Sequence, residues 1–295
     1  MVRSIDFEGT IELTAQEINF LSKLMVKRIA VISTSNHPDY FFYVPIVTWV
    51  WNKFGWDVAL FVTQDCMIST LFYPEGEFKA TMYGIPDVEG VRPGTCAQTV
   101  RHFVADVLPQ DAYIMVQDID LIPLKNFWNP DVEKKTIYGW ELTGKSFIPV
   151  HYTGMLGKYW YEIMGCTGDL KADMERAMKE NGRAYAKQED WESWWNTDWD
   201  ILTQKFKKHG LDKFTFVPRE LIKLAKDPTP YGRIDRYDFK STMAQEEWLD
   251  FHGENNNSAA PEKWQFLKTI LERCFGELPS WMDEHAKNHY AKYGK

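Results

Sequence analysis

The stretch Asp111-Ala-Tyr-Ile-Met-Val-Gln-Asp-Ile-Asp-Leu-Ile-Pro-Leu124 carries the strongest fold signal in the chain. Residues 113–116 form a short, continuous apolar run, which is typical of a strand in a sheet that is covered on both faces. Two carboxylates, Asp118 and Asp120, follow this run one residue apart. In an extended chain, residues two apart point to the same side, so we expect the two carboxylates to project together beyond the strand.

This aspartate pair predicts a particular chemistry. Neighbouring carboxylates repel each other unless a proton or a cation lies between them. Open α/β sheets bind their ligands at the carboxyl ends of the strands. Mg²⁺ and Mn²⁺ accept oxygen ligands and take part of their shell from substrate phosphates. The pair therefore predicts a divalent metal ion and a phosphorylated substrate, the alternative being an acidic pair on a solvated loop.

The segments around this strand alternate between strand and helix patterns. Residues 27–33 and 57–63 are predicted strands, and residues 40–54 a helix that is broken or kinked near Pro45. A second helix is predicted at residues 96–107. This β-α-β-α-β order predicts an α/β fold with a Rossmann-like, mostly parallel central sheet flanked by helices. Further strands are predicted at 136–140 and 147–152, and further helices at 159–164, 170–181, 198–209 and 262–275.

The pattern also predicts how the chain is organised. Residues 1–26 resemble an N-terminal appendage with one capped helix, residues 27–275 form the main domain, and residues 276–295 form a C-terminal helical tail. Two stretches, 73–94 and 249–262, are predicted to be irregular because they are rich in loop-forming residues.

Composition excludes several classes of protein. The net charge of -8 argues against a general nucleic-acid binder, so a nucleic-acid partner is not expected. The four cysteines form no Cys-x-x-Cys pair, which is typical of a reducing compartment. No apolar run approaches the ~20 residues of a transmembrane helix. These features predict a cytoplasmic location.

A second candidate site lies near the other end of the chain, in Leu249-Asp-Phe-His252-Gly253 followed by Lys263-Trp264. An imidazole beside carboxylates favours Mn²⁺ over Ca²⁺ or Mg²⁺. Alone, His252 reads as a hydrogen-bonding histidine; together with Asp118 and Asp120 it reads as a metal ligand.

The third candidate site is Trp191-Glu-Ser-Trp-Trp-Asn-Thr-Asp198-Trp-Asp200. Asn196 or Thr197 is expected to cap a helix, which places Asp198 in its first turn. There the carboxylate either contacts acceptor hydroxyls, serves as a base, or only complements the helix dipole. The tryptophans are either core residues or faces for a sugar. Arg101 either reaches a diphosphate or lies on the surface.

In this order, these segments resemble glycosyltransferases of the GT-A fold over residues 27–266. The resemblance is carried by AVISTSN at 30–36, TVRHFVADVLP around Arg101, QDIDLIPL around the aspartates, HYTGMLG at 151–157, WNTDWDIL around Asp198, and the His-Gly…Lys-Trp pattern.

The resemblance implies a role for each candidate residue. Ser33, Thr34, Arg101, Asp118 and Lys263 would bind the donor nucleotide. Asp118, Asp120 and His252 would hold Mn²⁺ or Mg²⁺. Asp198 would be the catalytic residue, which either takes the acceptor proton or positions the sugar. Lys263 lies farther from His252 than in the family pattern and follows Pro261.

The function that this implies is metal-dependent transfer of a sugar from a nucleoside-diphosphate sugar, such as a UDP-sugar, to an acceptor hydroxyl on a glycan, lipid, protein or modified base. Retention and inversion both stay open. One alternative is a sugar-nucleotidyltransferase, although the first loop, STSNHPDY, lacks the expected glycines. Another is a non-catalytic carbohydrate-binding protein that uses the tryptophan cluster.

Overall fold

The computed structural model describes residues 26–64, 79–126, 131–138, 148, 150–187, 190–217, 232–234, 248–253 and 257–294. The helix predicted within residues 1–26 lies outside these ranges. None of the helices in the described part of the chain has the length and apolarity that a bilayer-spanning helix requires.

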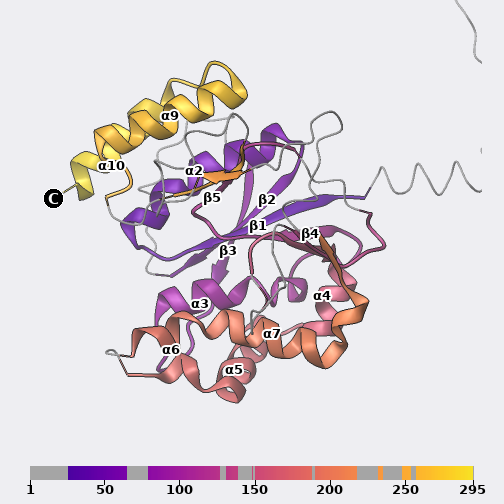
Figure 1. Cartoon of the computed structure of the whole chain (residues 1–295). Helices are drawn as coiled ribbons and strands as arrows, with labels where there is room; N and C mark the ends of the chain where they lie inside the picture. The colour runs from indigo at the N-terminus through magenta and orange to yellow at the C-terminus, as the bar shows by residue number, and fades with distance from the viewer. Residues whose placement is uncertain are drawn as a thin grey trace, which may run out of the picture.

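Seven strands in the described ranges form a central mixed sheet (Figure 1). Strands β1, β2, β3 and β4 are mutually parallel, β7 is antiparallel to both β4 and β6, and β8 is parallel to β6. The predicted mostly parallel α/β sheet is therefore confirmed. In spatial order the strands are β3 (Ala80–Ile85), β2 (Asp57–Thr63), β1 (Arg28–Thr34), β4 (Tyr113–Val116), β7 (Thr153–Leu156), β6 (Thr136–Tyr138) and β8 (Thr215–Val217).

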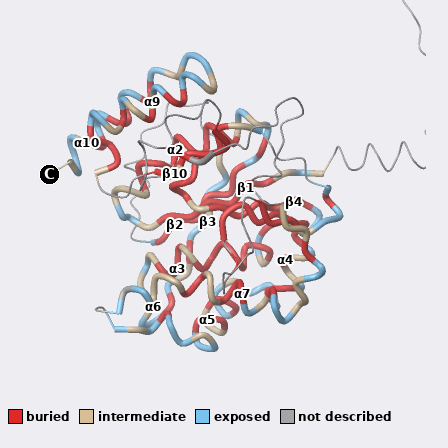
Figure 2. Tube along the Cα trace, in the orientation of Figure 1, coloured by how far each residue is buried: buried red, intermediate tan, exposed pale blue. Residues whose placement is uncertain are grey.

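The central strands are apolar on both faces, as the sequence predicts. In β1, Ile29 and Val31 pack into one hydrophobic core, while Ala30 and Ile32 pack into the other. Figure 2 shows the result as a buried layer of strands between two layers of helices.

Helices cover both faces of this sheet (Figure 1). One core contains residues from α2 (Pro38–Lys53), α9 (Pro261–Phe275) and α10 (Trp281–Tyr293). The other core contains residues from α3 (Pro93–Val100), α4 (Gly157–Met164), α5 (Leu170–Asn181) and α7 (Thr197–His209). The remaining helical elements are the five-residue α6 (Trp191–Trp195) and the 3₁₀ turns η2 (Val104–Asp106), η3 (Arg183–Tyr185) and η4 (Leu211–Lys213).

A small second sheet joins distant parts of the sequence. Strand β10 (Trp248–His252) lies between β5 (Leu121–Pro123), with which it pairs antiparallel, and β9 (Gly232–Ile234), with which it pairs parallel. Because β5 directly follows the aspartate pair, this pairing brings the candidate histidine segment to the end of β4.

Several sequence-based predictions differ from the structure. Helix α2 is not broken at Pro45 but runs through it as one element. The helix predicted at 96–107 is instead α3, which ends at Val100, followed by the 3₁₀ turn η2. The strand predicted at 147–152 begins instead at Thr153. Two strands lie in stretches predicted to be irregular: β3 is a largely exposed edge strand without an apolar pattern, and β10 interrupts its buried apolar residues with Asp250.

We expect Gly157→Ala to destabilise the fold. A Cβ on Gly157, the first residue of α4, would lie 2.5 Å from the backbone oxygen of Pro109 and 2.8 Å from Cα of Gln110. Since backbone atoms must move, the free energy of unfolding should fall by about 1–3 kcal/mol in urea denaturation.

The matched control is Gly94→Ala in the first turn of α3, where an added Cβ meets no atom within 4 Å. This change should be neutral or slightly stabilising, because alanine favours helix over glycine. Equal losses in the two variants would contradict the packing argument.

Candidate active site

The centre of the candidate site follows from the pairing of β4 with β7. Val116, the last residue of β4, is paired with Thr153, the first residue of the antiparallel β7. Asp118 and His151 each lie two residues beyond this pair, and the Asp118 Oδ2 atom is 3.5 Å from His151 Nδ1. The backbone bends between His151 and β7 at Tyr152, whose φ of 58° is rare for a bulky residue.

Arg101 joins two carboxylates that are distant in the sequence. It is the C-cap residue of α3, and its side chain is almost completely buried. Its Nη1 donates to Asp118 Oδ1 at 2.5 Å, and its Nη2 donates to Asp198 Oδ2 at 2.9 Å. Further bonds to the backbone oxygens of Gln117 and Gln98 fix the guanidinium in place.

These three groups set each other's charge. Burial opposes the charge of Arg101, but the carboxylates of Asp118 and Asp198 outweigh it and raise the pKa of the guanidinium. Burial also opposes ionisation of Asp118, yet Arg101 and His151 hold its pKa well below the usual range. Asp198 differs: burial, opposed by Arg101 and reinforced by Asp118, raises its pKa to about 7. The network therefore holds one firmly ionised carboxylate and one that titrates near neutrality.

Asp120 lies in a second contact group. Its Oδ2 is 3.7 Å from His252 Nε2. Its backbone oxygen accepts a hydrogen bond of 2.7 Å from the backbone N–H of Gly253, and the next residue, Leu121, is paired with His252. The structure thus brings together Asp120 and His252, two of the three predicted metal ligands.

The predicted extended chain between the two aspartates is not found. Strand β4 ends at Val116, and a turn follows in which the backbone N–H of Leu121 donates to the backbone oxygen of Asp118 at 3.2 Å. As a result, the carboxylates have different partners: Asp118 meets Arg101 and His151, while Asp120 meets His252.

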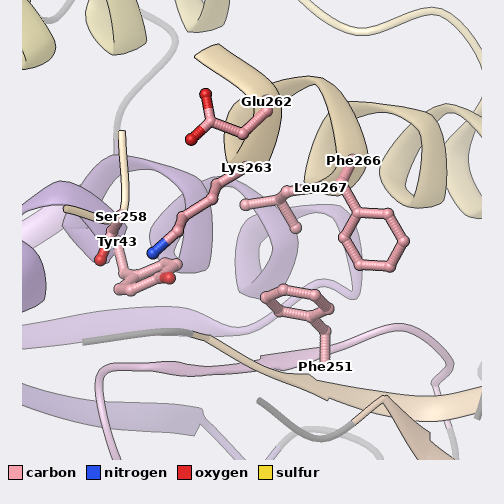
Figure 3. Close-up of a pocket in the computed structure, with 7 residues that line it drawn as sticks. All are labelled: Tyr43, Phe251, Ser258, Glu262, Lys263, Phe266 and Leu267. Carbon is pink, nitrogen blue, oxygen red and sulfur yellow. The ribbon is translucent and has the colours of Figure 1, made fainter. Parts of the chain in front are cut away.

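Lys263 lies in a pocket next to this second group. The pocket, of about 190 Å³, is formed by α2, β10 and α9, and in Figure 3 the lysine points toward Ser258 and Tyr43. Tyr43 packs so closely on Gly253 that a Cβ there would collide with its ring. Lys263 is therefore separated from the His252–Gly253 segment by one tyrosine ring.

Ser33 and Thr34 are the last residues of β1, beside the end of β4. Both are buried. The Ser33 hydroxyl donates to the Ala97 oxygen at 2.5 Å, and the Thr34 hydroxyl donates to the Ser35 oxygen at 2.9 Å. The Ser33 hydroxyl ties β1 to α3, so its predicted part in donor binding stays a prediction.

No protein-family model and no curated protein matches this sequence. Among solved structures, the apo-form glycosyltransferase GlyE of Streptococcus pneumoniae TIGR4 is similar, with a TM-score of 0.50 and 10% identity over 90% of this chain. The chain has the GT-A glycosyltransferase fold.

This chain spans 64% of the length of the GlyE chain. A crystal structure of the galactosyltransferase LgtC, solved with donor and acceptor sugar analogs, also matches, with a TM-score of 0.48 and 10% identity over 87% of this chain and 99% of that one.

The fit of this candidate site to a divalent cation rests on Asp120 and His252, which offer an oxygen and a nitrogen on facing side chains. A second group of potential metal ligands lies outside this site, among the described residues. It consists of Asp106, Cys166 and Asp173, whose ligand atoms all lie within 4.8 Å of one another. In that set, Asp173 is already bonded to Arg176 and Thr167.

Sequence reasoning missed His151 as part of the site. The HYTGMLG pattern predicts no role for its histidine, because the antiparallel direction of β7 leaves no local signal in the sequence.

The predicted capping of α7 is also wrong in detail: Asn196 is the N-cap residue but its side chain makes no capping bond. Asp198 does lie in the first turn, and its Oδ1 accepts the N–H of Trp199 at 2.8 Å.

We expect Arg101→Met to reduce the free energy of unfolding by about 3–5 kcal/mol, because it leaves buried carboxylates without their counter-charge. Urea denaturation at neutral pH measures this loss. The matched control is Arg183→Met, which breaks the 2.7 Å ion pair with Asp200 in a more exposed position. It should cost under about 1 kcal/mol. Similar losses in both variants would contradict the bridging role of Arg101.

Proposed function

We propose that the protein is a metal-dependent glycosyltransferase that moves a sugar from a nucleoside-diphosphate sugar to an acceptor hydroxyl. The observation that carries this proposal is the convergence at one sheet edge of two groups: the Asp120–His252 pair and the Asp118–Arg101–Asp198 network. The Asp120–His252 pair suits a cation, and the network contains a titratable carboxyl, Asp198, that is bonded to Arg101. The GT-A fold is compatible with this chemistry.

In this proposal Asp118, Asp120 and His252 hold Mn²⁺ or Mg²⁺. When bound, the cation would supply Lewis-acid stabilisation of the negative charge on the departing diphosphate. Asp120 and His252 already face each other. Asp118 is held by Arg101 through Oδ1 and lies 3.5 Å from His151 Nδ1 through Oδ2, and each carboxylate oxygen has a second lone pair that would meet the cation or the donor ribose.

The donor's remaining contacts are assigned by position. Ser33 and Thr34 end β1 next to β4, so they border the place where the nucleotide would lie. Lys263, one ring away from Gly253, would meet the phosphates after a rotation of its flexible side chain.

Asp198 is assigned the role next to the reacting sugar. Its carboxyl is buried and oriented by both Arg101 and the Trp199 N–H, so it is held in a fixed position. With a pKa of about 7, it can accept a proton under physiological conditions. In an inverting reaction it would take the proton of the acceptor hydroxyl; in a retaining one it would position the donor sugar.

The donor site is tested by a thermal-shift screen of UDP-sugars with and without Mn²⁺. A ligand at 100 times its dissociation constant should stabilise the protein by roughly 2.7 kcal/mol. We expect a melting-temperature rise that requires both UDP-sugar and Mn²⁺, and we expect Asp120→Asn to abolish it.

The control for this substitution is Asp212→Asn, which changes an exposed carboxylate in η4, the turn that follows α7. It should respond to UDP-sugar and Mn²⁺ as the wild type does. A shift that persists in the Asp120→Asn variant would remove Asp120 from the metal site, and no shift in the wild type with any nucleotide sugar would sink the proposal.

We expect Asp198→Asn to lower turnover of the donor about 10²-fold or more, because the amide cannot accept the proton. If Asp198 is the base, wild-type turnover should rise with pH through about 7, as the carboxyl loses its proton, and this rise should be absent from the variant. Mn²⁺-dependent UDP binding should persist. Wild-type turnover in the variant would reduce Asp198 to a structural residue.

A further inference from the structure

A row of aromatic side chains lies beside the candidate active site. The rings of His37 and Tyr40 are 5.1 Å apart, those of Tyr40 and Trp195 are 6.2 Å apart, and those of Trp195 and Trp194 are 5.9 Å apart. The guanidinium of Arg92 lies 4.4 Å from the centre of the Trp194 ring. We call His37, Tyr40, Trp195, Trp194 and Arg92 the aromatic strip.

The members of the aromatic strip come from three separate segments. His37 and Tyr40 lie at the start of α2, just after β1 ends at Thr34. Arg92 is the N-cap residue of α3 and follows β3. Both connections leave the carboxyl edge of the parallel strands, which is the edge where open α/β sheets bind ligands.

The strip is also adjacent to the proposed catalytic carboxyl. Trp195 ends α6 and is followed, after Asn196 and Thr197, by Asp198 in the first turn of α7. A ligand that stacks on Trp195 would therefore lie near the carboxyl that Arg101 holds.

The rings of the strip are more accessible than those of the core. Trp51, Trp56 and Trp160 are among the largest fully buried side chains. In contrast, Tyr40, Trp194 and Trp195 are partly exposed, and His37 is exposed. Four aromatic rings in contact with one another, left partly open at a ligand-binding edge, are a surface suited to stacking.

We propose that the aromatic strip binds the sugar units of a neutral glycan acceptor and directs one hydroxyl toward Asp198. The C–H faces of a pyranose ring are apolar and pack on aromatic faces, while its hydroxyls stay hydrated at the rim. The planes of Trp194 and Trp195 meet at 74°, so they present two differently oriented faces rather than one flat slot. Such an angled surface fits consecutive sugar rings better than a planar base. The acceptor role rests on the proposed function.

The charge around the strip supports a neutral ligand. Asp39 lies in α2 next to Tyr40, Asp190 caps α6, and Glu192 is exposed in α6. Arg92 is the one cation of the strip as defined, and its guanidinium stacks on Trp194. A polymer with many phosphates or carboxylates would be repelled by these acidic groups and by the net charge of -8.

The test is isothermal titration of the full chain with maltohexaose, cellohexaose, chitohexaose and a galactohexaose. We expect the wild type to bind at least one of them and Trp195→Ala to bind it at least tenfold more weakly. Trp195→Phe should lose less affinity, because a phenyl ring keeps a stacking face. The matched control is Tyr293→Ala, which removes an exposed ring on α10 and should bind as the wild type does. Melting temperatures identify any variant that fails to fold.

Three results would overturn the proposal: no binding of any of the four oligosaccharides by the wild type, unchanged affinity in folded Trp195→Ala, or equal losses in Trp195→Phe and Trp195→Ala. The thermal-shift response to UDP-sugar and Mn²⁺, measured on the same wild-type sample, separates the two proposals. Strip-dependent oligosaccharide binding without a nucleotide response would support the carbohydrate site and overturn the transferase function. A nucleotide response without oligosaccharide binding would do the opposite.

Discussion

The site depends on one buried, positively charged side chain, that of Arg101. Arg101 has no aqueous surroundings to stabilise its charge, so its two carboxylate partners are needed to keep it ionised in the interior. In return it fixes the end of β4 to the start of α7, two segments that share no strand pairing. The two acids differ in pKa. Burial opposes the ionisation of both, but Arg101 and His151 offset it more fully at Asp118 than Arg101 does at Asp198. Burial, Arg101 and His151 together set the charge state of the two acids, and Arg101 also joins the segments that carry them.

The second constraint is the pairing of β5 with β10. The pairing is short, but its terminal pair joins Leu121, the residue after Asp120, to His252. The backbone bond from Gly253 to Asp120 extends it by one step. Helix α2 supports this pair from behind, since Tyr43 packs on Gly253 while Asp39 of the same helix accepts hydrogen bonds from Ser258. Helix α2 therefore contributes Tyr40 to the aromatic strip and Tyr43 to the pocket that contains Lys263.

The sequence was informative where burial imposed a pattern. Four elements were predicted at or within one residue of their observed bounds: β1, β2, β4 and α5. Burial leaves a continuous apolar run in the three strands and spaced apolar residues in the helix. Strand β3 was missed because it is an exposed edge, where the residues on its faces are not selected by a core. The partners of Asp118 were missed because Arg101 and His151 meet it through strand order and direction, which local patterns do not encode. The meeting of Asp120 with His252 was expected from ligand chemistry and from the family resemblance, but no local pattern predicts the strand pairing that brings them together.

The order of pairing has a consequence for how the molecule is made. Strand β4 lies between β1 and β7, while in the described part of the chain β5 pairs with β10, which comes much later in the sequence. A polypeptide emerging from the ribosome can assemble the parallel strands β1, β2, β3 and β4 early, but the Asp120–His252 contact must wait until residue 252 has been synthesised. Long-range contacts of this kind carry a large loop-closure cost and form slowly. Binding competence should therefore arise later than the assembly of these parallel strands.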